Sequence, residues 1–307
     1  MKEERPDVRL CAFAYGAYRN PPMNLAVEPG TVLEFVHGYH AMKEWQGWSD
    51  LGVGLALRPN WLHSGANAPY LTLTQVGDFL RFARQNGMVQ HRFDSLHGYW
   101  ATQGPNYYLI ARLSSRPDLT VEDVIAEYAS AFGPAAPAIT RWIGYWQNYS
   151  DRLAITLAAG GEVPVDPNGL YETTCRLHGH PTHPLLGSWR ILPHLYNETV
   201  LAEADAILHE AMQLAAADPT ATKRVSFLKA GLRFLRATRD LMAMINEQPE
   251  PKTPERAELL RQITAIRDLS SELSPQHVVW GDVVLGAISR RILKIDAASS
   301  EVDLQGR

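Results

Sequence analysis

The chain has 307 residues, of which 46% are hydrophobic and 20% charged, and its net charge at pH 7 is -4. This composition is typical of a globular protein with a large core, and the lack of a basic surplus argues against a nucleic-acid partner. No apolar run is long enough to span a membrane, and the first residues, "MKEERPDVRL", lack the apolar segment of a signal peptide, so we expect no membrane partner.

Four short β-type runs fill the first hundred residues, between loops rich in proline, glycine and asparagine. They are residues 8–16, 31–38, 52–60 and 88–96. Between the third and the fourth run, "TLTQVGDFLRFARQNG" has apolar residues at helical spacing, and Gly87 is a natural helix stop. A strand, a helix and a strand joined by short loops form a βαβ unit, so we predict that the strands pair in parallel in chain order.

The four runs alternate between an apolar face and a mixed face. The mixed face is predicted to carry Glu34, Gly54, Ala56, Arg58, Gln90, Arg92 and Asp94, and the apolar face of the fourth run Val89, His91 and Phe93. This alternation is typical of a (β/α) barrel, in which the apolar face packs on outer helices and the mixed face lines the lumen. An open doubly wound sheet would show near-continuous apolar strands instead. Four strands cannot close a barrel of eight, so either residues 1–118 form half of a (β/α)8, TIM-like barrel, an α/β fold, or the partner strands lie on sequence not present here.

The remaining residues, 119–307, are predicted to form an all-helical region. One helix should begin at Thr120 as its N-cap, carry acids in its first turn and end near Gly133. A later segment, which starts at Asn197, has a single apolar stripe at helical spacing. The stripe consists of Leu201, Ala204, Leu208 and Ala211. Amphipathic segments of this kind favour a helix bundle.

Aromatic, histidine and polar side chains gather where the strand runs end. They are Tyr15, Tyr39, His40, Trp45, Arg58, Asn60, Trp61, His63, His97, Tyr99 and Trp100. Loops that follow parallel strands open on one face of a barrel, so we expect these side chains to converge. Sugar rings stack their apolar C–H faces on tryptophan and tyrosine, and their hydroxyls need polar partners, which favours a carbohydrate site. Alternatively, part of the aromatic set only packs the loops together.

Two carboxylates are candidates for catalysis. Glycoside hydrolysis needs a pair, one that donates a proton and one that acts as base or nucleophile. Asp94 lies at the C-terminal end of a strand, where barrel enzymes keep their chemistry, and Glu34 lies on the predicted lumen face. The alternative for Asp94 is a loop cap, and the alternative for Glu34 is a buried ion pair with Arg58 or Arg92.

The loop "CRLHGHPTHP", residues 175–184, combines a cysteine with three histidines at ligand-like spacing. Its candidate ligands are Cys175, His178, His180 and His183. A structural zinc site needs four converging ligands in a closed shell, and two prolines stiffen this stretch, so we predict a covering loop without zinc. No nucleotide-binding fingerprint occurs, and we expect no cofactor and no metal.

Several long motifs resemble the family called domain of unknown function 4838. They are "FAYGAYRNPP" (13–22), "LRPNWLHSGANAPY" (57–70), "FDSLHGYWATQGPNYYLIARL" (93–113), "EYASAFGPAAPAI" (127–139) and "RVSFLKAGLRFLRAT" (224–238). The family is similar to the barrels of α-glucuronidases and family-20 hexosaminidases. The resemblance implies a carbohydrate-active protein that hydrolyses O-glycosidic bonds, with a non-catalytic carbohydrate-binding protein as the alternative.

The resemblance also implies that this sequence starts at the second half of the barrel, so that residues 1–118 would be its C-terminal half. The general acid of related barrels sits at the end of the fourth strand, which would then lie outside this sequence, so the chain by itself need not be active. The run at 8–16 would be left with an apolar edge, which would pair with the missing barrel half or with another chain.

Overall fold

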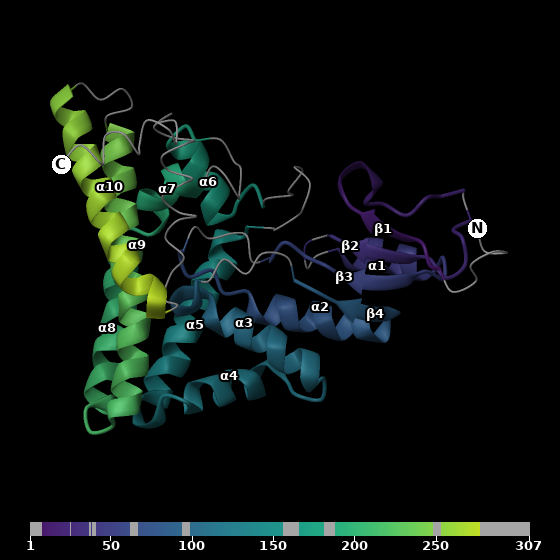
Figure 1. Cartoon of the computed structure of the whole chain (residues 1–307), viewed down its shortest axis with the longest axis horizontal. Coiled ribbons are helices and arrows are strands. Elements are labelled where there is room, and N and C mark those ends of the chain that lie inside the picture. The colour runs from purple at the N-terminus through teal and green to yellow at the C-terminus, as the bar shows by residue number, and fades with distance from the viewer. Residues whose placement is uncertain are drawn as a thin grey trace.

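The computed structural model describes residues 8–24, 26–36, 38, 41–61, 67–93, 99–155, 166–180, 188–247 and 253–276. A small sheet lies at one end of the molecule and a larger set of helices at the other (Figure 1). The strands are β1 (Cys11–Ala14), β2 (Val32–Phe35), β3 (Gly54–Leu57) and β4 (Met88–His91). They pair in parallel in the order β1-β2-β3-β4, which confirms the pairing predicted from the βαβ pattern.

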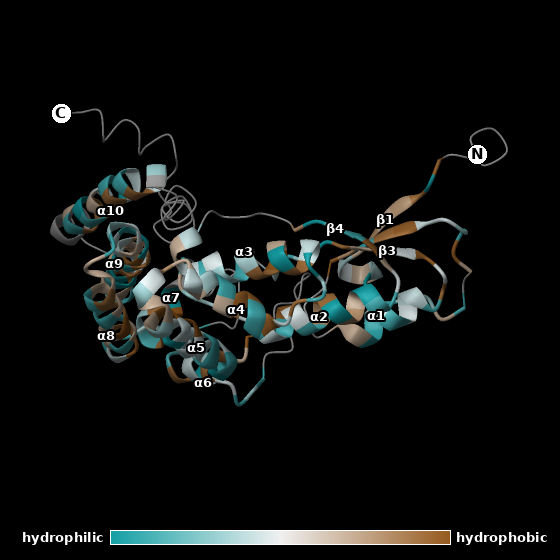
Figure 2. Ribbon diagram, turned by 90° about the horizontal axis from the view of Figure 1, so that it is seen from below, coloured by the Kyte–Doolittle hydropathy of each residue, from teal (hydrophilic) through white to brown (hydrophobic). Residues whose placement is uncertain are grey.

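Two helices cover one face of this sheet. Helices α1 (Met42–Ser49) and α2 (Leu73–Gln85) lie on the same side of the strands (Figure 2). The residues that alternate toward them are buried, namely Leu33, Phe35, Leu55, Leu57 and, from α2, Val76, Phe79, Leu80 and Ala83. The predicted helix before β4 is therefore confirmed, and Gly87 follows it with φ +82°, a conformation that favours glycine. No described helix covers the opposite face of the sheet.

An aromatic cluster fills the space between the sheet and its helices. Trp45 of α1 packs edge-on against Phe35 at 5.0 Å between ring centroids, and against Phe79 of α2 at 5.8 Å. Trp61 meets Phe79 at 5.6 Å. The expectation that Trp45 and Trp61 belong to an open loop rim is wrong, because both are buried here and the packing alternative holds for them. Large apolar rings gain more from burial than from exposure at a rim.

The rest of the described chain is helical apart from its connections. Its helices are α3 (Trp100–Ser115), α4 (Val121–Ser130), α5 (Ala136–Leu153), α6 (Leu170–Leu177), α7 (Ser188–Leu195), α8 (Glu198–Ala215), α9 (Pro219–Glu247) and α10 (Thr253–Leu273). A short 3-10 turn, η3 (Gly133–Ala135), lies between α4 and α5, while η1 (Gly16–Tyr18) follows β1 and η4 (Ser274–Gln276) follows α10. Thr120 caps α4 through a reciprocal capping box with Asp123, as predicted for this start. None of the described helices combines the length and the apolar character that crossing a bilayer requires.

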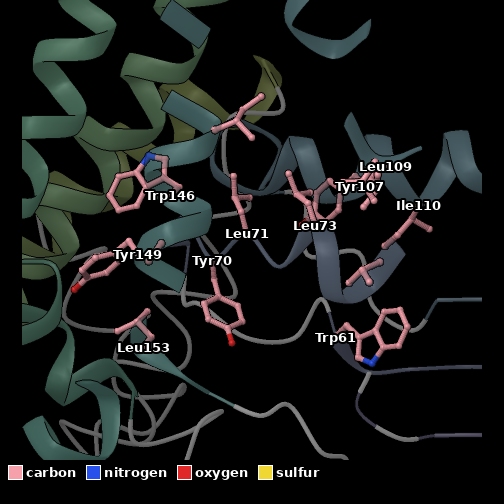
Figure 3. Packing of buried hydrophobic residues seen from close by; sticks show 14 of the residues in the cluster. Trp61, Tyr70, Leu71, Leu73, Tyr107, Leu109, Ile110, Trp146, Tyr149 and Leu153 are labelled. Atoms are coloured by element: carbon pink, nitrogen blue, oxygen red, sulfur yellow. The ribbon is translucent and has the colours of Figure 1, made fainter. Parts of the chain in front are cut away.

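One hydrophobic core runs from the sheet into the helical part. Figure 3 shows Trp61, Leu73 and Tyr107 of this core together with Trp146 and Tyr149 of α5. The predicted stripe of α8 faces the same core, since Leu201, Ala204, Leu208 and Ala211 are fully buried. A second, smaller cluster joins the start of α3 to α9 and α10. The main core continues across residue 118, where we expected the boundary between the two parts.

A buried connection, residues 68–72, links the sheet to α2. Its backbone groups bond to side chains, because a buried segment without regular structure has no other partners. Asn106 of α3 donates to the Tyr70 carbonyl at 2.8 Å and accepts from the Thr72 amide at 3.3 Å. Gln103 donates to the Ala68 carbonyl at 2.8 Å, and the Ser150 hydroxyl accepts from the amide of Leu71. The polar side chains of α3 and α5 thereby fix this connection against the helices.

Candidate functional site

The uncovered face of the sheet carries the most concentrated chemistry among the described residues. We call it the open face and define it by Phe13, Glu34, Arg58, Gln90 and Arg92. The strand register brings them together, since Phe13 pairs with Glu34, Glu34 with Ala56, and Ala56 with Gln90. The parity predicted for Glu34, Arg58, Gln90 and Arg92 is therefore confirmed.

Backbone bonds continue the ladder past the strand ends and position the two arginines. The amide of Arg58 donates to the Phe35 carbonyl at 3.0 Å, and the amide of Arg92 donates to the Leu57 carbonyl at 2.8 Å. Both guanidinium groups thus stand at the carboxyl ends of neighbouring strands. In parallel α/β folds this is the edge where ligands bind.

Glu34 is held between these two arginines. Arg92 Nη2 donates to Glu34 Oε2 at 2.6 Å, and Arg58 Nε lies 3.6 Å from the same oxygen. Glu34 is only 7% exposed although no described helix covers this face. The ion-pair alternative that we weighed for Glu34 is therefore present, and with both arginines.

Neighbouring groups extend the cluster around Arg58. Its guanidinium carbon lies 5.6 Å from the centroid of the Phe13 ring, within cation–π range, and its Nη1 approaches Asn60 Oδ1 at 3.4 Å. Phe13 is half exposed, and Tyr15, which directly follows β1, is also exposed. An aromatic surface, an amide and two guanidiniums on one face match the demands of a polyhydroxylated ligand that has an apolar side.

A bulge in β4 changes one predicted side chain. Leu55 pairs with Met88 and Ala56 with Gln90, so Val89 is an extra residue in the ladder. The Val89 methyls are among the atoms nearest to the outward side of Gly54, and the side chain is 61% exposed. The expectation that Val89 shares the apolar face with His91 and Phe93 is wrong, because a bulged residue breaks the period of two.

Tyr99 and Trp100, which we expected at the strand-end site, lie against the helices and not on the open face. Tyr99 is buried in the second core cluster with residues of α9 and α10, and this burial raises the pKa of its phenol. Trp100, the first residue of α3, lines a pocket between α3, α4 and α9. The structure therefore places neither of them beside the ion-paired Glu34, and Tyr99 has a packing role.

Five predicted site residues lie outside the described residues. They are Tyr39, His40, His63, Asp94 and His97. The catalytic role predicted for Asp94, and the convergence of these side chains, stay predictions.

The histidines of the 175–184 stretch meet a partner from another helix. Cys175 is buried within α6, where burial raises the pKa of its thiol. His178 stacks on His194 of α7 with 3.5 Å between ring centroids, and His180 lies 5.9 Å from His194. His183 lies outside the described residues. Among those that are described, no group of three or more histidine, cysteine, aspartate or glutamate side chains is arranged to hold a metal ion.

The sequence analysis did not select every contributor to the open face. Phe13, Gln90 and Arg92 were absent from our candidate ligands, although the strand alternation had already assigned Gln90 and Arg92 to the mixed face with Glu34. Phe13 was overlooked because an apolar residue in a strand is normally assigned to the core. Its place on an edge strand, with the guanidinium of Arg58 above it, depends on the pairing register.

Fold and open face together define an α/β protein in which a parallel four-stranded sheet leads into a helical region. Residues 1–144 match the model of a family described as Domain of unknown function (DUF4838). The chain is therefore similar to this family over its first 144 residues, and the family resemblance is confirmed there. No curated protein and no solved structure matches the chain.

Proposed function

We propose that this is a carbohydrate-active protein whose open face binds a sugar ring. The proposal treats β1–β4 as part of a (β/α)8-type barrel and the open face as its interior. The parallel order without crossing strands, and the position of both helices on one face, support this reading. In such a barrel, ligands meet the side chains at the carboxyl ends of the strands.

The observation that carries the proposal is the cluster around Glu34. Its carboxylate, two guanidiniums and an amide offer several hydrogen-bonding groups within a few ångströms, next to the exposed ring of Phe13. A purely structural ion pair would not need the aromatic neighbour. A sugar ring would use both, because its hydroxyls bond to charged groups while its C–H face packs on an aromatic ring.

Hydrolysis of a glycosidic bond is the reaction that we favour, with Asp94 as nucleophile or base. One carboxylate oxygen of Glu34 is already engaged by two arginines. Glu34 is therefore better suited to orient a substrate than to attack it. Simple sugar binding is therefore the second candidate, and the engaged state of Glu34 is the observation that favours it. Glycoside hydrolysis needs two carboxylates in catalytic roles. With Glu34 engaged by the arginines, the face would bind a sugar without cleaving it.

Binding and cleavage can be separated with three variants. The chain would be titrated by calorimetry against xylo-, cello-, manno- and chito-oligosaccharides, and released reducing ends would be assayed in parallel. Arg92→Ala should weaken binding roughly tenfold or more, since it removes a charged donor from the open face. Asp94→Asn should lower turnover more than binding if Asp94 is catalytic.

Glu210→Gln is the matched control, because Glu210 also forms an arginine pair, with Arg141, but on the helical part. It should leave binding unchanged. If no oligosaccharide of the panel binds, or if Arg92→Ala binds as tightly as the unmodified chain, the open face is not a sugar site.

A further inference from the structure

A pocket separate from the open face lies between three helices of the larger part of the molecule. It has a volume of about 440 Å³ and is lined by Trp100, Gly104 and Tyr108 of α3, Tyr128 of α4 and Phe227 of α9. The three α3 residues follow at intervals of four, so they share one face of that helix. Four aromatic side chains from three helices thus surround one space.

The floor of this pocket exists because residue 104 is a glycine. A Cβ at this position would lie 3.1 Å from the hydroxyl oxygen of Tyr128, tighter than an ordinary van der Waals contact. Because residue 104 has no side chain, the space between Trp100 and Tyr108 on this face of α3 stays open toward Tyr128. A larger side chain would fill the space and press on Tyr128.

Among the tryptophans whose side chains the structure describes, Trp100 is the exposed one. It is 40% exposed, whereas Trp45, Trp48, Trp61, Trp142 and Trp146 are each at most 8% exposed. Its ring is braced edge-on against Tyr107, which is buried, at 4.8 Å between centroids. A fixed, exposed indole at the mouth of a pocket presents a flat apolar surface without the entropy loss of ordering it on binding.

Polar groups stand beside the Tyr108 wall of the pocket. Burial and then the nearby Glu127 carboxylate raise the pKa of the Tyr108 phenol, and Arg112 Nε donates to Glu127 Oε2 at 2.9 Å. Tyr108 also packs edge-on against Tyr128 at 5.5 Å, which places both phenols at this pocket. A ligand here meets aromatic walls and, at its edge, hydroxyl, carboxylate and guanidinium groups.

We propose that this pocket is a second carbohydrate subsite, separate from the open face, which takes a pyranose ring stacked on Trp100. A pyranose has an apolar C–H face for the indole and equatorial hydroxyls for the Tyr108, Glu127 and Arg112 groups. A plain aromatic ring would use the walls but leave these polar groups without a role. The choice of a sugar as ligand rests on the function proposed for the open face.

The test follows the indole N–H signal of Trp100 by NMR in the full chain labelled with ¹⁵N-tryptophan. Trp100→Phe identifies the signal, and the probes are xylohexaose, cellohexaose and, separately, 4-nitrophenol. We expect a saturable shift of this signal with at least one hexasaccharide, at lower concentration than with 4-nitrophenol. Trp100→Ala should weaken the binding that this pocket contributes roughly tenfold.

Two further variants keep the outcome interpretable. Gly104→Ala should suppress the shift by narrowing the pocket, with a far-UV circular dichroism spectrum to verify that it folds. Tyr18→Ala removes an aromatic ring that is 80% exposed near β1 and should change nothing.

The result separates the two proposals. A Trp100 signal that stays fixed while Arg92→Ala abolishes sugar binding would overturn the subsite and leave the open face standing. If the unmodified chain binds sugar only at the pocket, and the Trp100 shift is the same in Arg92→Ala, the result would support the subsite and refute the open face. A response to 4-nitrophenol alone would also overturn the subsite.

Discussion

Glu34 shows how a carboxylate is kept on a sheet face that no described helix covers. Arg92 bonds to it at 2.6 Å from β4, and Arg58 reaches the same oxygen from the end of β3. Removal of water from a carboxylate is costly unless charged donors replace it, and here two of them do. The three side chains thereby join three neighbouring strands.

We predict that Glu34→Gln lowers the free energy of unfolding by about 1–2 kcal/mol, because a neutral amide replaces a charge-assisted bond at a buried position. Urea denaturation followed by circular dichroism measures this. Glu210→Gln, in an exposed pair, should change it by less than about 0.5 kcal/mol. Equal losses in both variants would mean that the Glu34 cluster is no stronger than a surface pair.

The histidine contact between α6 and α7 predicts a pH dependence of stability. Burial, then Arg190 and His178, lower the pKa of His180, and burial, then His178 and His180, lower the pKa of His194. Below their usual pKa of 6.5 the unfolded chain therefore binds more protons than the folded one. Stability should rise with pH between their lowered folded pKa values and 6.5, and it should fall as the pH drops through this window.

Thermal melts at pH values above and below 6.5 test this sign. His194→Asn should reduce the loss of Tm on acidification, since one histidine with a lowered pKa is gone. His209→Asn, on the exposed face of α8, serves as the control and should leave the pH profile unchanged. If His194→Asn and the unmodified chain lost the same Tm on acidification, the predicted contribution of His180 and His194 to the pH dependence would be contradicted.

Single residues were predictable where they depend on local chemistry. Thr120 as a cap and Gly87 as a stop need only neighbouring backbone groups, and both are confirmed. Tyr99 was not predictable, since its burial depends on Phe234 of α9 and Leu259 of α10, far along the chain. An aromatic residue in a loop looks the same in sequence whether a distant helix covers it or not.

The buried connection between β3 and α2 depends on hydrogen bonds from a neighbouring helix. Residues 68–72 have few backbone partners of their own, so α3 supplies them through Gln103 and Asn106. These polar residues lie on a helix face that points into the core. Their conformation is stabilised because each donor and acceptor is satisfied.

Asn106→Ala should lower the free energy of unfolding by about 2–4 kcal/mol, since the Tyr70 carbonyl and the Thr72 amide would stay buried without this partner. The urea midpoint is the measurement. Gln147→Ala removes an exposed amide that donates to Thr74, and should change stability by less than about 0.5 kcal/mol. An unchanged midpoint for Asn106→Ala would show that the connection does not depend on α3.

Strand alternation predicted the faces of β2 and β3 but failed at one place in β4. Leu55, Leu57 and Ala56 follow the period of two, whereas Val89 departs from it at a bulge. The extra residue is recognisable only from the pairing of two strands. A pattern read along one strand has no means of showing it.

At the scale of the whole molecule, β1 forms an edge of the sheet. It pairs with β2 on one side, and no described strand lies on the other. Val8, Leu10, Phe13 and Tyr15 are all exposed along this segment. The apolar edge predicted for 8–16 is therefore present, and edges of this kind recruit further strands.

We predict concentration-dependent self-association that Leu10→Lys reduces, because a charge on an edge strand opposes pairing with another chain. Sedimentation velocity over a range of concentrations is the measurement. Met23→Lys adds the same charge at a 95% exposed position outside the strand and should leave association unchanged. A strictly monomeric chain would show that the edge is protected.

The global arrangement limits what the sequence could reveal about the sites. The mixed α/β class and the parallel strand order follow from local patterns, and both are confirmed. The pocket at Trp100 combines α3 and α4 with Phe227 of α9, which lies more than a hundred residues from α3 in the chain. Periodicity within one helix shows that Trp100, Gly104 and Tyr108 share a face, but not which distant helix lies beside it.

The most direct test of the proposed carbohydrate site is a crystal structure of the chain with the tightest-binding oligosaccharide of the panel. We predict a sugar ring on the open face, with its hydroxyls bonded to the guanidinium groups of Arg58 or Arg92 and its apolar side on Phe13. An open face that stays empty at saturating oligosaccharide, while sugar is bound elsewhere, would contradict the proposal.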